Sequence, residues 1–167
     1  VIHPAKIQNN SLTNFQFAIV FADADNNKVS GNTVEGIGIG FGGFSWSIVV
    51  MGGDGNKITD NEVSNSPVGI FLAESTGDAL RNELHDNIIG ILLCTPDWLV
   101  LPNGTPIPRP ESANHWLVSK NESNDNTWGY LAIDGAFDNV LFKNKASNNA
   151  LYDIELAGES SRFGFPM

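Results

Sequence analysis

Asparagine recurs along this chain at a fixed place in a short pattern, and this repeat restricts the fold more than any other feature of the sequence. In six segments an aliphatic residue stands three positions before an Asn. A base period of about 22 residues, lengthened by insertions, accounts for all the intervals between them. The six residues are Asn10, Asn32, Asn61, Asn87, Asn121 and Asn144.

Each repeat also contains two apolar residues separated by one position, and this alternation predicts short β-strands. In the second repeat Ile37/Ile39 competes with Ile48/Val50, and the interval from Ile48 to the next Asn favours the second pair. No segment sustains the period of a helix. The predicted inward pairs are Ile19/Phe21, Ile48/Val50, Ile70/Leu72, Ile91/Leu93, Leu131/Ile133 and Ile154/Leu156.

A unit of about 22 residues is too short to bury its apolar face alone, so the units must stack on one another. Stacking pairs the strand edges at about 4.8 Å and predicts an all-β solenoid, a parallel β-helix of about six coils. Identical Asn residues on successive coils would then form an internal ladder of amide hydrogen bonds. We expect residues 1–167 to form one domain with outward loops at about 35–46 and 95–114.

The pattern Asn-x-Val-x-x-Asn-x-Val followed by Gly-Ile-x-Ile resembles the repeat of right-handed parallel β-helix proteins, the pectate-lyase-like and NosD-like families. The resemblance covers residue 5 to about residue 158 and implies a right-handed, single-stranded parallel β-helix. It does not imply one function, because lyases, hydrolases, epimerases, phage tailspikes and non-catalytic surface proteins share the fold. The Gly-His-Gly and Arg-Ile-Lys motifs of polygalacturonase-like enzymes and the Asp-Pro-His motif of alginate epimerases are absent from the sequence.

Composition excludes several classes of protein. The chain has 19 acidic and 9 basic residues and a net charge of −10, which argues against binding nucleic acid. No stretch approaches the ~18 consecutive apolar residues of a membrane span, so we predict no membrane insertion. Cys94 is the only cysteine, which rules out an internal disulfide.

Residues between the inward pairs are expected to point outward and to form columns across the coils. One column is apolar over four coils, and such a stripe is usually covered, either by loops of the same chain or by a partner chain. The column consists of Val20, Val49, Phe71, Leu92, Ala132 and Glu155. Trp46 and Trp98, in the two predicted loops, are candidates for packing on this stripe or for stacking against sugar rings.

A second outward column, four positions before each ladder Asn, begins with three lysines. Like charges stacked at about 4.8 Å repel unless something anionic lies nearby. A uronate or sulfated glycan would fit, as would carboxylates of the protein itself; lysines also simply protect a solvated sheet. The column consists of Lys6, Lys28, Lys57, Glu83, Leu117 and Val140.

Acidic residues follow the predicted second strands. Asp23 and Glu74 occupy equivalent positions two coils apart, roughly 9.6 Å at the stacking distance, close to the ~6.5–9.5 Å that separates the carboxyl groups of inverting glycosidases. They are therefore candidate catalytic residues. Asp23, Asp25 and Asp54 are candidate calcium ligands, although Asp in turns is also ordinary turn chemistry. No other metal site or cofactor is predicted, and His85 beside Asp86 is interpreted as a surface histidine.

Three functions remain open from the sequence. The first is a non-catalytic extracellular module that binds a glycan or a protein partner. The second is a lyase, hydrolase or epimerase acting on uronate-containing polysaccharide, and the third is a structural spacer in a larger assembly. We expect a secreted, cell-surface or periplasmic bacterial protein. We also expect a segment of a longer protein, with association through the β-helix ends, because an open coil exposes unpaired backbone groups and core side chains.

Overall fold

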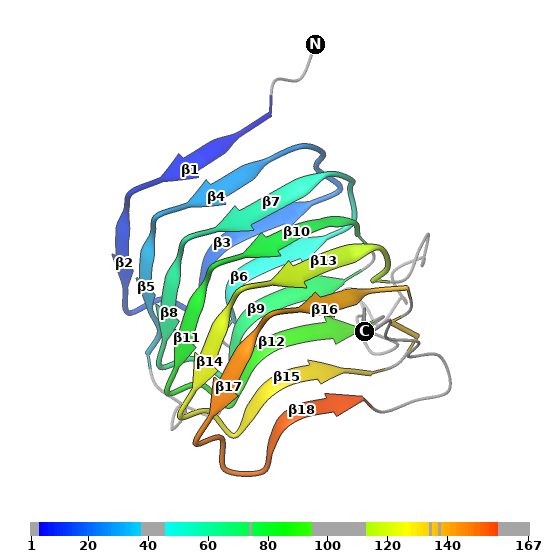
Figure 1. Ribbon diagram of the computed structural model, residues 1–167. Helices are drawn as coiled ribbons and strands as arrows, with labels where there is room; N and C mark the ends of the chain where they lie inside the picture. The colour runs from blue at the N-terminus through cyan, green and yellow to red at the C-terminus, as the bar shows by residue number, and fades with distance from the viewer. Residues whose placement is uncertain are drawn as a thin grey trace, which may run out of the picture.

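The fold is that of a computed structural model, described here for residues 4–37, 46–73, 75–94, 113–133, 135–136 and 138–156. The described residues form eighteen short strands and no helix. The strands wind around a common axis in six coils of three strands each (Figure 1).

All strand pairs are parallel and join equivalent strands of successive coils. Sheet A contains β1 (Lys6–Gln8), β4 (Lys28–Ser30), β7 (Asn56–Thr59), β10 (Gly77–Leu80), β13 (Trp116–Ser119) and β16 (Val140–Phe142). Sheet B contains β2 (Ser11–Thr13), β5 (Thr33–Glu35), β8 (Glu62–Ser64), β11 (Glu83–His85), β14 (Glu122–Asn124) and β17 (Lys145–Ser147). Sheet C contains β3 (Phe17–Ala22), β6 (Trp46–Met51), β9 (Val68–Ala73), β12 (Ile89–Cys94), β15 (Trp128–Ala132) and β18 (Tyr152–Leu156).

This arrangement is a right-handed parallel β-helix, the hand that nearly all parallel crossovers adopt. The predicted fold class and the number of coils are therefore confirmed. The second repeat uses Ile48 and Val50, which pair with Ile19 and Phe21 of the first coil. Of the two predicted loops, residues 38–45 and 95–112 lie outside the described part of the chain.

The core lies between the three sheets and is built from one aliphatic or aromatic layer per coil. The predicted inward pairs are correct in all coils except the fifth. There Tyr130 pairs with Ile91 and Ala132 with Leu93, so Tyr130 and Ala132 occupy the core positions. The predicted pair Leu131/Ile133 was out of phase by one residue, and Leu131 faces outward with Leu92. Sheet C has apolar side chains on both faces at this point, so alternation could not reveal the phase.

The predicted Asn ladder runs through the corner between sheets A and B. Each side-chain Nδ2 donates to the Oδ1 of the next Asn at 2.9–3.0 Å. The fourth member is Asn82, so the prediction of Asn87 was wrong. The ladder consists of Asn10, Asn32, Asn61, Asn82, Asn121 and Asn144.

Asn87 belongs to a second ladder, in the corner between sheets B and C. At each step a backbone N–H donates to the side-chain Oδ1 of the Asn on the next coil, at 2.9–3.0 Å. These bonds run from Ser66 to Asn87, from Asn87 to Asn126 and from Asn126 to Asn149. Asn27 and Asn56 begin a third ladder in the corner between sheets C and A. Buried backbone N–H groups at all three corners are thus satisfied by side-chain amides, which is how a chain with such tight turns avoids unpaired polar groups.

Candidate functional site

The lysine column lies on the outer face of sheet A. Lys6, Lys28 and Lys57 are direct register partners in β1, β4 and β7. The fourth member is Asp78 of β10, followed by Leu117 and Val140. The prediction of Glu83 in this column was wrong. The column lies four positions before each ladder Asn, and the fourth ladder member is Asn82 in place of the predicted Asn87; Glu83 lies in sheet B.

Asp78 ends the row of lysines with an opposite charge. Its carboxylate lies 3.9 Å from Lys57 Nζ, and the two side chains are 34% and 60% exposed. This distance is at the limit of an ion pair, and exposed pairs contribute little to stability. No ion pair to Lys6 or Lys28 is found among the described residues.

Three further cations extend this row along the corner between sheets A and B. Arg81, Lys120 and Lys143 each stand directly before a ladder Asn and adopt left-handed backbone angles, with φ of 55–57°. Sequence reasoning missed them. The residue immediately before each predicted ladder Asn gives Lys120 and Lys143. It does not give Arg81, which precedes Asn82, because the sequence analysis predicts Asn87 in the place of Asn82.

The two groups of cations are adjacent. Arg81 binds the Asp60 carboxylate with two hydrogen bonds, at 2.6 and 2.8 Å. These bonds lower the pKa of Asp60, and the charge of Lys28 on the neighbouring strand lowers it further. The same contact raises the pKa of Arg81. Asp60 therefore lies between Lys28 of the row and Arg81 of the corner, and it links the two groups of cations into one surface.

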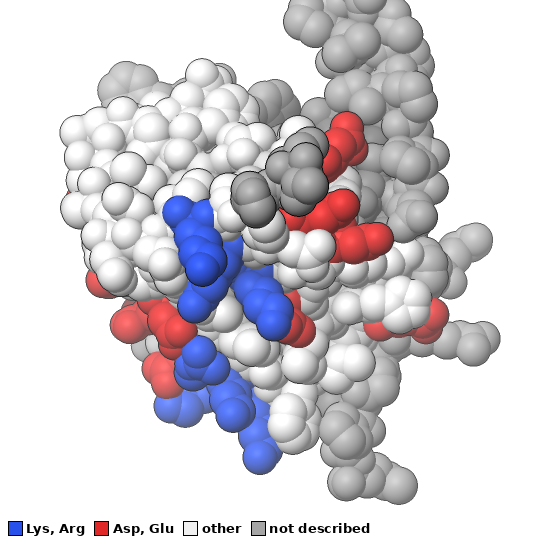
Figure 2. Space-filling view, turned by 90° about the horizontal axis from the view of Figure 1, so that it is seen from above, with Lys and Arg blue, Asp and Glu red and all other residues white. Residues whose placement is uncertain are grey.

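We call the six cations Lys6, Lys28, Lys57, Arg81, Lys120 and Lys143 the basic surface. Figure 2 shows Lys and Arg side chains gathered in a band on this face, with acidic side chains at its margins. Lys145, on the neighbouring strand β17, is bound to Glu122 at 2.5 Å, which raises the pKa of Lys145. Every described Lys and Arg thus lies on sheet A, on its corner with sheet B, or on β17.

The outer face of sheet B bears the opposite charge. Glu62, Glu83 and Glu122 are register partners on three successive strands. His85 lies beside them, with Nδ1 2.9 Å from Asp86 Oδ2 and Nε2 3.5 Å from Glu62 Oε1. Burial lowers the pKa of His85, but the hydrogen bonds to Asp86 and Glu62 outweigh this effect, and the pKa is raised.

The predicted acidic turn lies in the corner between sheets C and A, where its carboxylates bind neighbouring coils. Asp25 Oδ1 accepts a hydrogen bond from the Asp54 N–H at 2.8 Å, and Asp54 Oδ1 accepts one from the Thr76 hydroxyl at 3.0 Å. Asp23 is exposed and lies beside Gly52 of the next coil. Glu74, its predicted catalytic partner, lies outside the described residues.

Asp23, Asp25 and Asp54 do not converge into a cluster of three carboxylates of the kind expected for a calcium site. Among the described residues, no three His, Cys, Asp or Glu side chains lie close enough together to hold a metal ion. Nor does the described part of the chain contain a helix long and apolar enough to cross a membrane.

The apolar column of sheet C begins exposed and becomes buried. Val20 is 46% exposed, whereas Val49, Phe71 and Leu92 are 1%, 0% and 6% exposed in the single chain. Trp46 is the first residue of β6, not part of a loop, and stacks on Phe71 with ring centroids 4.5 Å apart. Trp46 thus packs on the stripe, and Trp98 lies outside the described residues.

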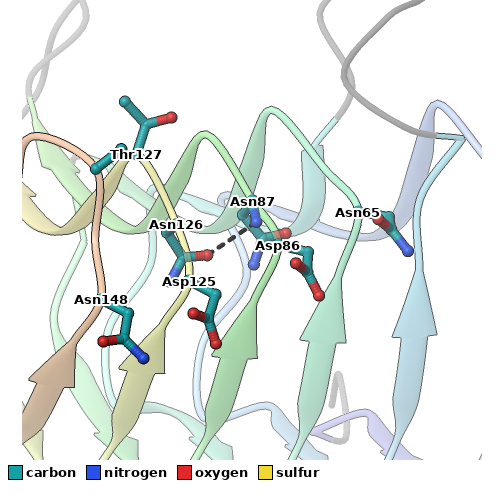
Figure 3. A pocket seen from close by; sticks show the side chains of 8 residues that line it. Asn65, Asp86, Asn87, Asp125, Asn126, Thr127 and Asn148 are labelled. Atoms are coloured by element: carbon teal, nitrogen blue, oxygen red, sulfur yellow. Dashed lines mark hydrogen bonds between the residues drawn. The ribbon is translucent and has the colours of Figure 1, made fainter.

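A shallow polar groove of about 410 Å³ runs along the corner between sheets B and C. Figure 3 shows Asp86, Asp125 and Asn148 on successive coils along it, with the Asn87–Asn126 ladder behind them. None of the described residues that line the groove is aromatic or basic. It is lined by Asn65, Asp86, Asn87, Asp125, Asn126, Thr127, Asn148 and Ala150.

Comparison with known proteins supports the fold alone. No protein-family model and no curated protein matches the chain. The A-module of the mannuronan C-5 epimerase AlgE4 from Azotobacter vinelandii has a similar structure, with a TM-score of 0.53 and 16% sequence identity. The match covers 96% of this chain and 57% of that one, so this chain spans little more than half the length of the epimerase module.

Proposed function

We propose that this chain is a non-catalytic β-helix module that binds an acidic polysaccharide along the basic surface. The observation on which the proposal depends is the segregation of charge. The protein has a net charge of −10, yet six of its seven described Lys and Arg residues lie on sheet A or on its corner with sheet B, three of them in direct register.

Such an arrangement is electrostatically unfavourable without a ligand. Cross-strand neighbours of like charge destabilise a sheet by an amount comparable to the ~0.2–1 kcal/mol that favourable pairs contribute. Lys6, Lys28, Lys120 and Lys143 have no carboxylate within ion-pair distance among the described residues. A polyanion lying across the strands, parallel to the β-helix axis, would contact one cation on each coil and remove this repulsion.

An extended anionic glycan also suits the shape of the surface. The basic surface follows a sheet face and a corner rather than a closed pocket, so a polymer can contact all six coils while remaining largely solvated. Binding of this kind is expected to be salt-dependent, because exposed charges are screened within ~8–10 Å at physiological ionic strength.

Catalysis is the less favoured alternative. The acidic residues in the same corner as Asp23, namely Asp25 and Asp54, are engaged in hydrogen bonds between coils. The central part of the outer face of sheet C, which precedes this corner, is apolar and buried. Loops on a rigid solenoid are where binding and catalytic residues usually lie, so activity of Asp23 with Glu74 stays the second hypothesis. A secreted or cell-surface bacterial location is part of the proposal, because acidic polysaccharides are extracellular polymers.

The proposal is tested by calorimetric titration with mannuronan and polygalacturonate at low and at physiological salt. We expect binding that weakens with salt, and a loss of at least tenfold in affinity in the variant Lys28→Glu/Lys57→Glu. The control is Lys145→Ala, which removes a cation already paired with Glu122 and should bind normally. Equal binding by the wild type and the double variant would refute the proposal.

The same polysaccharides serve to test the enzyme alternative. Incubation followed by product analysis should show no cleavage and no change of uronate configuration. Turnover that disappears in Asp23→Asn, with the fold intact, would establish the second hypothesis in place of the first.

A further inference from the structure

The ladder in the corner between sheets C and A is interrupted at the fourth coil. Asn27 donates to Asn56 Oδ1 through both its backbone N–H and its Nδ2, at 3.0 Å. The next register partner of Asn56 is Gly77, followed by Trp116. The ladder resumes where the Trp116 N–H donates to Asn139 Oδ1 at 2.9 Å.

The interruption comes from a shorter turn. One residue separates Ser75 from Gly77, whereas two separate Gly53 from Asn56 and Ala113 from Trp116. Backbone hydrogen bonds of Thr76 to Gly53 and of Asn114 to Ser75 align these turns. A Cβ at Gly77 would lie 2.0 Å from Asn56 O, and its φ of 155° also disfavours other residues, so no side chain can take the missing place.

Three polar atoms around this interruption are buried without a hydrogen-bond partner in the described structure: Asn56 Nδ2, Ser75 Oγ and Trp116 Nε1. Their residues are at most 1% exposed. They belong to three successive coils on both sides of Gly77. A buried polar group without a partner costs about 1–3 kcal/mol, so three of them in one corner require an explanation.

We propose that a buried water molecule replaces the missing ladder amide at Gly77. Water can accept the N–H groups of Asn56 and Trp116 and donate to Ser75 Oγ, which gives it the usual three hydrogen bonds of an internal water. One N–H of the Asn56 amide and the Trp116 indole N–H fill the two acceptor positions of a single water molecule, and the Ser75 hydroxyl oxygen accepts one of its hydrogens. An apolar ligand would leave all three groups unsatisfied.

The test is a water-selective NOE experiment on the full chain labelled with ¹⁵N, in which Trp116→Phe identifies the Trp116 indole resonance. We expect a cross-peak between the indole N–H and a water molecule of long residence time. In Ser75→Ala the water loses its acceptor, so we expect the cross-peak to weaken and the urea midpoint to fall.

The control is Ser66→Ala, because the Ser66 hydroxyl is paired with Ser47 at 2.5 Å. Its indole cross-peak should be unchanged. A Trp116 indole without a water cross-peak, in a protein that Ser75→Ala leaves equally or more stable, would refute the proposal. Removal of a buried hydroxyl that has no partner improves stability, whereas removal of one that is bound to water does not.

Discussion

At the scale of single residues, the ladder amides give the fold its specificity. Asn61 is 1% exposed, and its side chain takes part in four hydrogen bonds across coils, two of them accepted from Asn32. Asn suits this position because it both accepts and donates, whereas aspartate or an aliphatic residue would leave neighbours unpaired.

Replacement of Asn61 by leucine is therefore expected to lower the free energy of unfolding by about 1–3 kcal/mol, because the Asn32 donors lose their acceptor in a buried site. Urea denaturation followed by circular dichroism measures this difference. The control is Asn124→Leu, at a half-buried outward position of β14, which should change stability by less than about 0.5 kcal/mol. An Asn61→Leu protein as stable as the wild type would contradict the role given to the ladder.

His85 gives the sheet B surface a pH dependence. Its pKa is raised in the folded state by Asp86 and Glu62. A raised pKa means that the stabilisation is fully present below the unfolded value of about 6.5 and is lost as the pH rises through the folded value. Relative to His85→Gln, the wild type should therefore be more stable at pH 5.5 than at pH 8. Urea midpoints of both proteins at the two pH values measure the difference, and a gap that widens with rising pH would contradict the assignment.

At the scale of elements, sheet C differs from the other two sheets. Its inner face contributes to the main core, and its outer face forms a second apolar cluster that includes Phe71, Leu92 and Leu131. An antiparallel sheet of a soluble protein often exposes one polar face, whereas parallel sheets are commonly covered on both faces. The column is buried in the single chain from Val49 to Leu92, whereas Val20, at its start, is exposed.

Two leucines on outer faces provide a matched comparison. Leu92 is 6% exposed on sheet C, and Leu117 is 37% exposed on sheet A. Leu92→Ala is expected to cost about 2–5 kcal/mol, as in a core, and Leu117→Ala less than about 1 kcal/mol. Thermal and urea unfolding of the two variants measure both values. Equal, small losses would indicate that the outer column of sheet C is open to solvent.

At the scale of the whole molecule, like charges are stacked on two sheets of a strongly acidic protein. Lysines repeat on sheet A and glutamates on sheet B, and the net charge is −10. Stacked like charges and a high net charge both destabilise the compact state by repulsion. The last coil also exposes inward-facing side chains, with Ile154 at 42% and Leu156 at 41%.

We accordingly expect the melting temperature of the chain to rise between about 10 and 150 mM NaCl, because the Debye length falls from ~30 to ~8 Å. Differential scanning calorimetry at fixed pH measures the change. A variant with weaker repulsion, Glu83→Gln, should show a smaller increase. A melting temperature that falls with salt would show that attractive pairs such as Arg81–Asp60 outweigh the repulsion.

The sequence by itself determined the architecture, because a solenoid repeats the same physical requirement on every coil. Each tight corner needs a buried group that accepts and donates hydrogen bonds, and each strand needs an apolar pair, so the Asn and Ile positions recur and can be read without a structure. Five of the six ladder positions, the choice of Ile48 over Ile37 and the Lys6–Lys28–Lys57 row followed from this recurrence.

Tertiary structure alone decided what the repeat left ambiguous. Asn82 and Asn87 both follow an aliphatic residue by three positions, because two corners of the same coil have the same chemical requirement; only strand register distinguishes them. Tyr130 and Leu131 are both large hydrophobic residues, because sheet C is covered on both faces. Which of the two points into the core is therefore decided only by the pairing of β15 with β12. The basic surface, finally, joins residues from all six coils. Lys6, Lys28 and Lys57 keep one position of the repeat and Arg81, Lys120 and Lys143 another, so only the winding of the chain shows that the two groups lie on the same side.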